Sequence, residues 1–269
     1  MNLNQHTRIH HYNFNFFEKI KSENQAYWLG FLYADGCVHK NKIKIGLAIR
    51  DKCHLIRFCE DLGFKNFKFF ENTKTKSIVL TLSCKKMATD LEKIGCIPRK
   101  TYSLEFPNFL PENLLNHFIR GYFDGDGGVS VKKDGRKCFI IIVGRESFLK
   151  KLKEKINVGH IYKTSSDKVK CISICSKKQI DEFYNFIYEN ATVFLDRKKK
   201  KIESFQKDRL PNKVKTSSQV GVYFRKDRSK WVAFGYKNNK QITLGCFLTE
   251  EEATKKRQEF EKHKYEFSI

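Results

Sequence analysis

The stretch WLGFLYADG at residues 28–36 has a counterpart, IRGYFDGDG, at residues 119–127. Each is a mostly apolar run that ends in Asp-Gly, and the last acids of the two runs are Asp35 and Asp126. Each run also carries two small residues four positions apart, which places them on one face of a helix. These small residues are Gly30, Ala34, Gly121 and Gly125. We therefore predict two helices that pack closely through these faces and bring both acids to the same end.

The sequence around these stretches is also repeated. TLSCKKMATDL at residues 81–91 matches SICSKKQIDEF at 173–183, and IPRK at 97–100 matches LDRK at 195–198. Apolar and polar residues alternate over residues 42–50, as in a strand with one buried face. The pattern predicts an α+β fold of two αββαββα repeats, each with long helices over one face of an antiparallel sheet.

Local signals mark the ends of several elements. Ser22 and Gln25 form a capping-box pattern that begins the first helix, and Gly36 is expected to end it in a left-handed conformation. Pro111 is expected in the first turn of the equivalent helix of the second repeat. The Asp-Gly pair at residues 134–135 predicts a hairpin turn.

The composition changes after residue 205. The following QKDRLPNKVKTSSQ is polar and contains proline, as a linker does, and beyond it the sequence predicts three short strands and a helix. The expected segments are an extension (1–21), repeat 1 (22–105), repeat 2 (106–205), a linker (206–217) and a small βββα domain (218–266).

The overall composition restricts the class of protein. The chain has 269 residues and a formal net charge of +23, which favours a polyanionic partner such as nucleic acid. Its nine cysteines include no CxxC spacing, so we expect reduced thiols and no zinc site. Because the sequence has no membrane-spanning apolar run and no secretory signal pattern, we expect a soluble, intracellular protein with no membrane partner.

Two acids at adjacent helix ends are electrostatically unfavourable. The C-terminal end of a helix is partly negative, and neighbouring carboxylates repel each other. A divalent cation would offset both effects, and Mg²⁺ is the cation best suited to hard oxygen ligands and to substrate phosphates. We therefore predict that Asp35 and Asp126 bind Mg²⁺ for phosphodiester hydrolysis. The simpler alternative is that both Asp-Gly pairs only end helices.

The two stretches resemble the motifs of LAGLIDADG homing endonucleases in their two-repeat, single-chain form. The matching positions are the third-place glycines Gly30 and Gly121, the eighth-place acids Asp35 and Asp126, and the closing glycines Gly36 and Gly127. The resemblance covers about residues 23–205. Two positions depart from the family: Tyr33 stands where an acid is frequent, and Arg120 where a small apolar residue is usual.

The resemblance implies that the two sheets form concave saddles over the major groove of double-stranded DNA. The side chains expected to face DNA are Lys42, Lys44 and Arg50 in repeat 1, and Ser130 and Lys132 in repeat 2. It also implies a catalytic lysine near the acids in each half, with Lys100 and Lys198 at the matching positions. The alternatives are a solvated strand face and, for residues 197–201, an ordinary basic helix.

The C-terminal segment has a resemblance of its own, to AP2 DNA-binding domains, over about residues 219–264. The matching sequence is GVYFRKDRSKWVAFG followed by ITLGCFLTEEEA. In that family a three-stranded sheet enters the major groove, which implies DNA contacts from Arg225, Lys230 and Trp231. Tyr223 departs from the arginine that is common there. The alternative for Trp231 is a place in the core under the helix.

Together these observations favour a monomeric, site-specific DNA endonuclease. The resemblance implies a staggered double-strand cut with 3′ overhangs and an origin in a mobile element such as an intron. The alternative is an RNA maturase or a non-cleaving DNA-binding regulator on the same fold, for which intron RNA would be a partner. The presence of both Asp35 and Asp126 favours the enzyme, because a pure binder has no need of two repelling carboxylates.

Overall fold

The computed structural model describes residues 12–65, 67–97, 103–132, 137–164, 169–207, 219–225, 228–237 and 240–266. The chain divides into two compact units, one up to residue 208 and one from residue 209 onward. Among the described residues, no helix has the length and apolar character needed to cross a bilayer.

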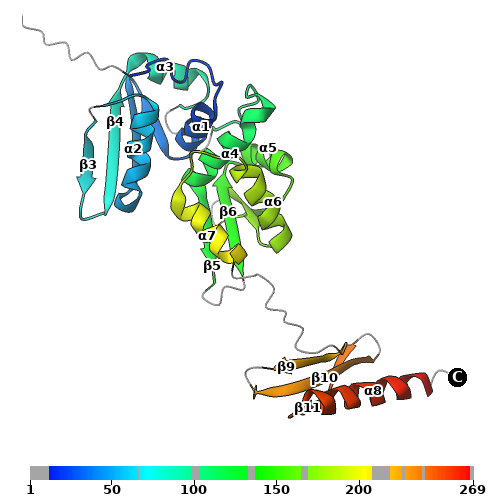
Figure 1. The fold of residues 1–269 in the computed structure, drawn as a ribbon. Coiled ribbons are helices and arrows are strands. Elements are labelled where there is room, and N and C mark those ends of the chain that lie inside the picture. The colour runs from blue at the N-terminus through cyan, green and yellow to red at the C-terminus, as the bar shows by residue number, and fades with distance from the viewer. Residues whose placement is uncertain are drawn as a thin grey trace, which may run out of the picture. The chain divides into compact units, whose positions relative to one another are not determined.

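The first unit contains two repeats with the same order of elements (Figure 1). Repeat 1 consists of α1 (Glu23–Asp35), β1 (Gly36–His39), β2 (Lys42–Ala48), the 3₁₀ turn η1 (Ile49–Asp51), α2 (Lys52–Asp61), β3 (Phe69–Asn72), β4 (Ser77–Ser83) and α3 (Lys85–Lys93). Repeat 2 consists of α4 (Glu112–Asp126), β5 (Gly127–Val131), β6 (Cys138–Gly144), α5 (Glu146–Ile156), β7 (His160–Lys163), β8 (Lys170–Ile174), α6 (Lys177–Tyr188) and α7 (Asp196–Lys207).

The strand orders of the two sheets are equivalent, β1-β2-β4-β3 in repeat 1 and β5-β6-β8-β7 in repeat 2. All neighbouring strands are antiparallel. The predicted α+β class with antiparallel sheets is confirmed. The expected hairpin pairs β5 with β6, although its turn at residues 134–135 lies outside the described residues. Sequence patterns had assigned no residues to α2 or α5.

Helices α1 and α4 pack side by side between the two sheets (Figure 1). A Cβ atom at Gly30 would come within 2.0 Å of the Phe118 carbonyl oxygen, and one at Gly121 within 1.9 Å of the Tyr27 carbonyl oxygen. Each glycine thus meets the residue three positions before the other glycine, the reciprocal pattern that a twofold relation produces. One turn further along, a Cβ at Gly125 would lie 2.3 Å from that of Ala34.

The ends of these helices differ from the expectation for Gly36. The Ser22–Gln25 capping box is present, but Gly36 is extended, with φ −78° and ψ 143°, and not left-handed. It pairs with Ile45 as the first residue of β1, and strand pairing requires an extended backbone. Glycine is needed here because a Cβ would approach the Leu32 side chain and carbonyl oxygen to 2.6 Å.

The core of the first unit lies between the sheets and the helices. In β2, Ile43 and Ile45 are buried while Lys42 and Lys44 are exposed, as the alternation predicts. The strand ends at Ala48, however, and the chain turns into η1, so Arg50 does not lie on the sheet. The expected extension also contributes to the core, because Phe17 is fully buried.

The second unit is a three-stranded antiparallel sheet with one helix. Its elements are β9 (Val222–Arg225), β10 (Lys230–Lys237), β11 (Lys240–Phe247) and α8 (Glu250–Glu266). The strand order is β11-β10-β9, and the small core contains Val222, Ala233 and Ala253. Helix α7 of the first unit extends to Lys207, two residues into the predicted linker, and residues 208–218 lie outside the described residues.

The helix interface generates a first prediction. Gly30→Ala or Gly121→Ala would force two backbones apart, since the added methyl group meets carbonyl oxygens that cannot move independently. We expect each variant to lose about 3 kcal/mol of unfolding free energy, the upper range for overpacking. Gly128→Ala is the matched control, because nothing lies within 4 Å of its Cβ position. Urea unfolding checks this, and equal stability of the three variants would contradict the close packing.

Candidate active site at the paired helix ends

Asp35 and Asp126 are the last residues of α1 and α4. The carboxyl carbon of Asp35 lies 3.5 Å from the Cβ position of Gly125, the residue that precedes Asp126. Asp35 is partly buried and Asp126 is exposed. The packing of the small-residue faces thus places both acids at one end of the helix pair, and each carboxylate acts electrostatically on Lys198.

The ammonium group of Lys198 is hydrogen-bonded to the C-terminal end of α4. Lys198 lies on α7 and is only 4% exposed. Its ammonium group donates to the carbonyl oxygens of Phe123 (2.7 Å), Asp124 (2.7 Å), Gly125 (3.3 Å) and Gly127 (2.5 Å). A cation is favourable at the negative end of a helix, and here it adds hydrogen bonds to carbonyl groups of the last turn, of which that of Phe123 also accepts from the backbone N–H of Gly127. Burial lowers the pKa of Lys198 to about 8, although the nearby carboxylates oppose this shift.

A buried hydrogen-bond chain supports the same helix end. One carboxylate oxygen of Asp124 accepts from the Tyr27 hydroxyl and from the backbone N–H of Leu195, both at 2.8 Å. The Tyr27 hydroxyl also lies 2.8 Å from Nε2 of His54. Because the Tyr27 hydroxyl donates its hydrogen bond to Asp124, the Tyr27 oxygen acts as the acceptor for His54, whose Nε2–H is the donor. Burial raises the pKa of Asp124 to about 6, against the effect of the Lys198 charge.

The two departures from the family pattern are accommodated within the helix pair. Tyr33 is 2% exposed and donates its hydroxyl proton to the carbonyl oxygen of Ile94. Arg120 is fully buried. Its guanidinium group donates to the carbonyl oxygens of Val193 (2.8 Å) and Ile187 (2.7 Å) and to the Glu23 carboxylate (2.6 Å). Since Glu23 begins α1, Arg120 joins both helices to the segment that leads into α7.

A cavity of about 210 Å³ opens beside Asp126. Tyr33, Tyr122 and Arg145 also line it. The Tyr122 hydroxyl donates to the carbonyl oxygen of Val143 at 2.9 Å, and burial together with the Asp126 charge raises its pKa. Arg145 is the residue before α5 and ion-pairs with Glu105. It places a cation near the acid that no local sequence pattern had indicated.

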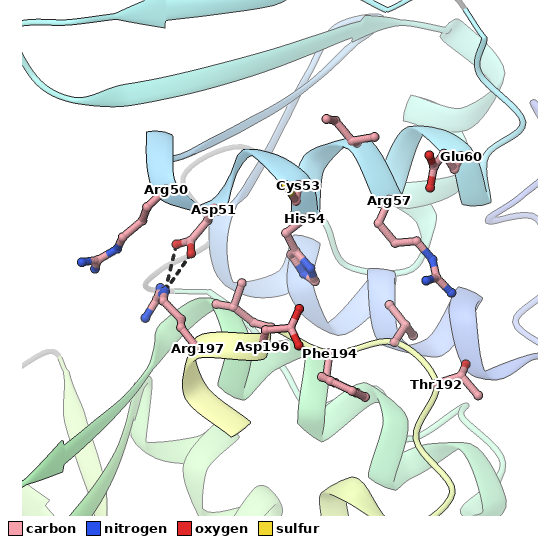
Figure 2. A pocket seen from close by; sticks show the side chains of 13 residues that line it. Arg50, Asp51, Cys53, His54, Arg57, Glu60, Thr192, Phe194, Asp196 and Arg197 are labelled. Carbon is pink, nitrogen blue, oxygen red and sulfur yellow. Dashed lines mark hydrogen bonds and ion pairs between the residues drawn. The ribbon is translucent and has the colours of Figure 1, made fainter. Parts of the chain in front are cut away.

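A larger cavity of about 560 Å³ lies where repeat 1 meets repeat 2 (Figure 2). It is lined by η1 and α2 on one side and by residues 192–197 on the other. Nε of Arg197 lies 2.9 Å from both carboxylate oxygens of Asp51, and this pair closes one end of the cavity. Arg50, expected to face DNA from the sheet, instead lines this cavity because the chain leaves β2 before it.

The remaining residues of the predicted sites are distributed as follows. Lys42 and Lys44 are exposed on β2, Ser130 is exposed on β5, and Lys132 is exposed just after β5. Lys198 acts electrostatically on both acids, and Lys100, the other predicted lysine, lies outside the described residues.

In the second unit, the predicted DNA-contacting residues do not share one face. Arg225 pairs with Lys230, whereas the next residue, Trp231, pairs with Phe224, and successive side chains of a strand point to opposite faces. Trp231 is half-buried and packs against the small core. The structure therefore places Trp231 on the core side of the sheet and Arg225 and Lys230 on the other face.

The site offers few protein ligands to a metal ion. Within the described ranges, no group of three or more histidine, cysteine, aspartate or glutamate side chains is arranged to hold one. Two carboxylates nevertheless fit a hard cation such as Mg²⁺, which keeps several waters and takes further oxygens from substrate phosphates. The donor set is thus compatible with a divalent cation.

Comparisons with known proteins agree with this architecture. Residues 113–188 of repeat 2 match the LAGLIDADG-like domain family. A lysine-to-alanine mutant of I-SmaMI matches with a TM-score of 0.50 and 12% identity, over 68% of this chain and 89% of that one. The I-LtrWI LAGLIDADG homing endonuclease bound to target DNA matches with a TM-score of 0.48 and 13% identity, over 73% and 90%. At 12% identity, the match to the I-SmaMI mutant concerns the fold alone.

One sequence relative is the replication factor C small subunit of Methanocaldococcus jannaschii. It is 26% identical over an alignment of 228 positions that covers 80% of this chain and 12% of that protein. The chain therefore spans about an eighth of the length of that relative.

The environment of Lys198 generates a second prediction. Lys198→Met keeps the apolar stem but removes the ammonium group from four carbonyl oxygens. We expect a loss of unfolding free energy on the order of 3 kcal/mol, because these buried acceptors lose their partner. Lys200→Met, an exposed position on the same helix, is the control and is expected to change stability by less than about 0.5 kcal/mol. Equal stabilities in urea unfolding would show that the ammonium group does not support the helix end.

His54 generates a third prediction, on pH dependence. Burial lowers the pKa of His54 to about 4 from 6.5, so the unfolded chain binds a proton more readily than the folded one. The resulting stabilisation is complete above pH 6.5 and is lost as the pH falls toward 4, by up to about 3 kcal/mol. In urea unfolding between pH 7.5 and 4.5, the unfolding free energy of His54→Gln should depend less on pH than that of the wild-type protein. His160→Gln, an exposed histidine, should keep the wild-type profile, and a wild-type profile in His54→Gln would refute the assignment.

Proposed function

We propose that the chain is a site-specific endonuclease of the LAGLIDADG type, which hydrolyses one phosphodiester bond in each strand of a DNA duplex. The observation that carries this proposal is the juxtaposition of Asp35 and Asp126 at the ends of two helices whose backbones touch. Two acids in this position repel each other and lie at the negative ends of their helices, so folding alone does not favour them.

The charge of the chain supports DNA as the substrate. A net charge of +23 attracts a polyanion, and Lys42 and Lys44 stand exposed on the face of β2 that is not covered by helices. The strands β1 and β5 begin directly after Asp35 and Asp126. A duplex lying on the two sheets would therefore have its backbone close to both acids.

Each residue of the site has a distinct task in this proposal. Asp35 and Asp126 would hold Mg²⁺ ions, which activate water and stabilise the leaving oxygen when bound. Lys198 keeps the end of α4, and with it Asp126, in position. Lys100 is proposed to be the catalytic lysine of the other half of the site. Each acid is proposed to serve one strand, so that one chain supplies a complete site without a second copy, and the resemblance to LAGLIDADG endonucleases implies a staggered cut.

The second unit is proposed to be an AP2-like module that binds DNA beside the cleavage site. Its support is the pairing of Arg225 with Lys230 on the sheet face away from the small core. Tethering makes a second, weak contact nearly intramolecular, so such a module raises the affinity of the whole chain.

Cleavage of a randomised double-stranded DNA library with Mg²⁺ tests the function. Asp35→Asn and Asp126→Asn remove one carboxylate charge each, and we expect either change to lower double-strand cleavage at least roughly 100-fold. Binding of the duplex at fixed salt should stay within about threefold, because the acids do not attract phosphate. Glu154→Gln, an exposed acid on α5, is the matched control and should cleave normally.

The outcome separates the endonuclease from its alternatives. Cut ends that converge on one sequence and disappear in both aspartate variants support the proposal. Folded wild-type protein that binds DNA or RNA without cutting would instead favour a maturase or a DNA-binding regulator.

A further inference from the structure

The open faces of the two sheets differ in chemistry at equivalent positions. Strand registers define the equivalence, because Gly36 after the first acid pairs with Ile45, and Gly127 after the second pairs with Ile142. The residue before each of these isoleucines faces away from the helices. It is Lys44 in repeat 1.

In repeat 2 the position of Lys44 is occupied by Ile141, and that of Lys42 by Phe139. At these two positions the central strands therefore carry basic side chains in repeat 1 and apolar ones in repeat 2, where Ile141 is exposed and Phe139 is half-buried. Ile141 is 40% exposed, and on β7, beyond β8, Tyr162 is 53% exposed; the place of Tyr162 in repeat 1 is taken by Phe70 of β3, which is 68% exposed. Exposed apolar side chains gathered on one sheet face indicate a binding surface.

The surroundings of Ile141 leave room for a ligand. Ile141 pairs with Gly128 on one side and with Ser173 on the other. Nothing lies within 4 Å of the Cβ position of Gly128, so the isoleucine stands beside open space. A small apolar group can reach it there without displacing a side chain.

The position of this face favours DNA over a protein partner. It begins directly after Asp126, and Lys132 follows β5 on the same face, two residues after the exposed Ser130. A cation beside an apolar centre suits the phosphates and base edges of a major groove. A second copy of the chain is disfavoured, because two molecules of charge +23 repel each other.

We propose that the two repeats read different bases: repeat 2 recognises thymine methyl groups through Ile141 and Phe139, whereas repeat 1 recognises guanine through Lys42 and Lys44. Apolar side chains contact the thymine methyl group in the major groove, and lysine donates to the N7 and O6 acceptors of guanine. The inference rests on the proposed endonuclease function and adds that its target has one A·T-rich half and one half with essential guanines.

The experiment begins by selecting duplexes that the full chain binds from a randomised library. In the selected duplex, deoxyuridine replaces thymidine in one half at a time, which removes only the methyl group. We expect affinity to fall about fourfold per methyl group in one half and to stay unchanged in the other. Replacing guanine by 7-deazaguanine removes the N7 acceptor. This change should lower the affinity in the half that is insensitive to deoxyuridine and leave it unchanged in the other half.

Two variants assign the halves to the repeats. Ile141→Ala should abolish the sensitivity to deoxyuridine and leave the 7-deazaguanine effect intact, and Lys44→Ala should do the reverse. Both side chains are exposed, so folding is checked by thermal unfolding. Deoxyuridine without effect in either half, or Ile141→Ala with altered preference at G·C pairs, would overturn the inference.

The proposed function and this inference fail in different ways. If the selected duplex is bound but not cut with Mg²⁺, the endonuclease proposal fails while the base-analogue comparison still decides the inference. If no sequence is enriched, base recognition by either sheet is refuted.

Discussion

The structure depends on the contact between the backbones of α1 and α4. Gly30 and Gly121 allow each helix to meet a carbonyl oxygen of the other, at separations that any Cβ would prevent. That contact fixes the distance between the repeats and the alignment of their sheets, because each strand β1 and β5 continues directly from its helix. It also determines that Asp35 and Asp126 end at the same place.

This packing creates an electrostatic cost, and the surrounding residues show how it is offset. Lys198 brings its ammonium group to the carbonyl oxygens at the end of α4, and Asp124 is held by Tyr27 and the Leu195 backbone. These bonds come from both repeats and from α7. Buried hydrogen bonds therefore hold the end of α4 in place, while Asp126 itself remains exposed. A support of this kind preorganises carboxylates for a cation without neutralising them.

Local signals predicted much of the fold. The capping box, the alternation in β2 and the small-residue faces each lie within a few consecutive residues, and the small-residue face occurs in both repeats. Contacts between distant segments were not predictable. No pattern near His54 indicates that it meets Tyr27, and the alternation that continues through Arg50 does not show that the chain turns at η1. Gly36 ends α1 as predicted, but the left-handed conformation expected for it was wrong, because pairing with Ile45 in the sheet requires an extended backbone.

The duplication explains why one half of the molecule can change without the other. The two repeats must keep the glycines and the acids, since these meet across the shared helix interface, but the open sheet faces do not touch each other's side chains through that interface. Lys44 and Ile141 occupy equivalent places with opposite chemistry, while the isoleucines beside them, Ile45 and Ile142, are both buried and identical. Packing thus constrains one face of each strand, and the other face is free to diverge toward a different ligand.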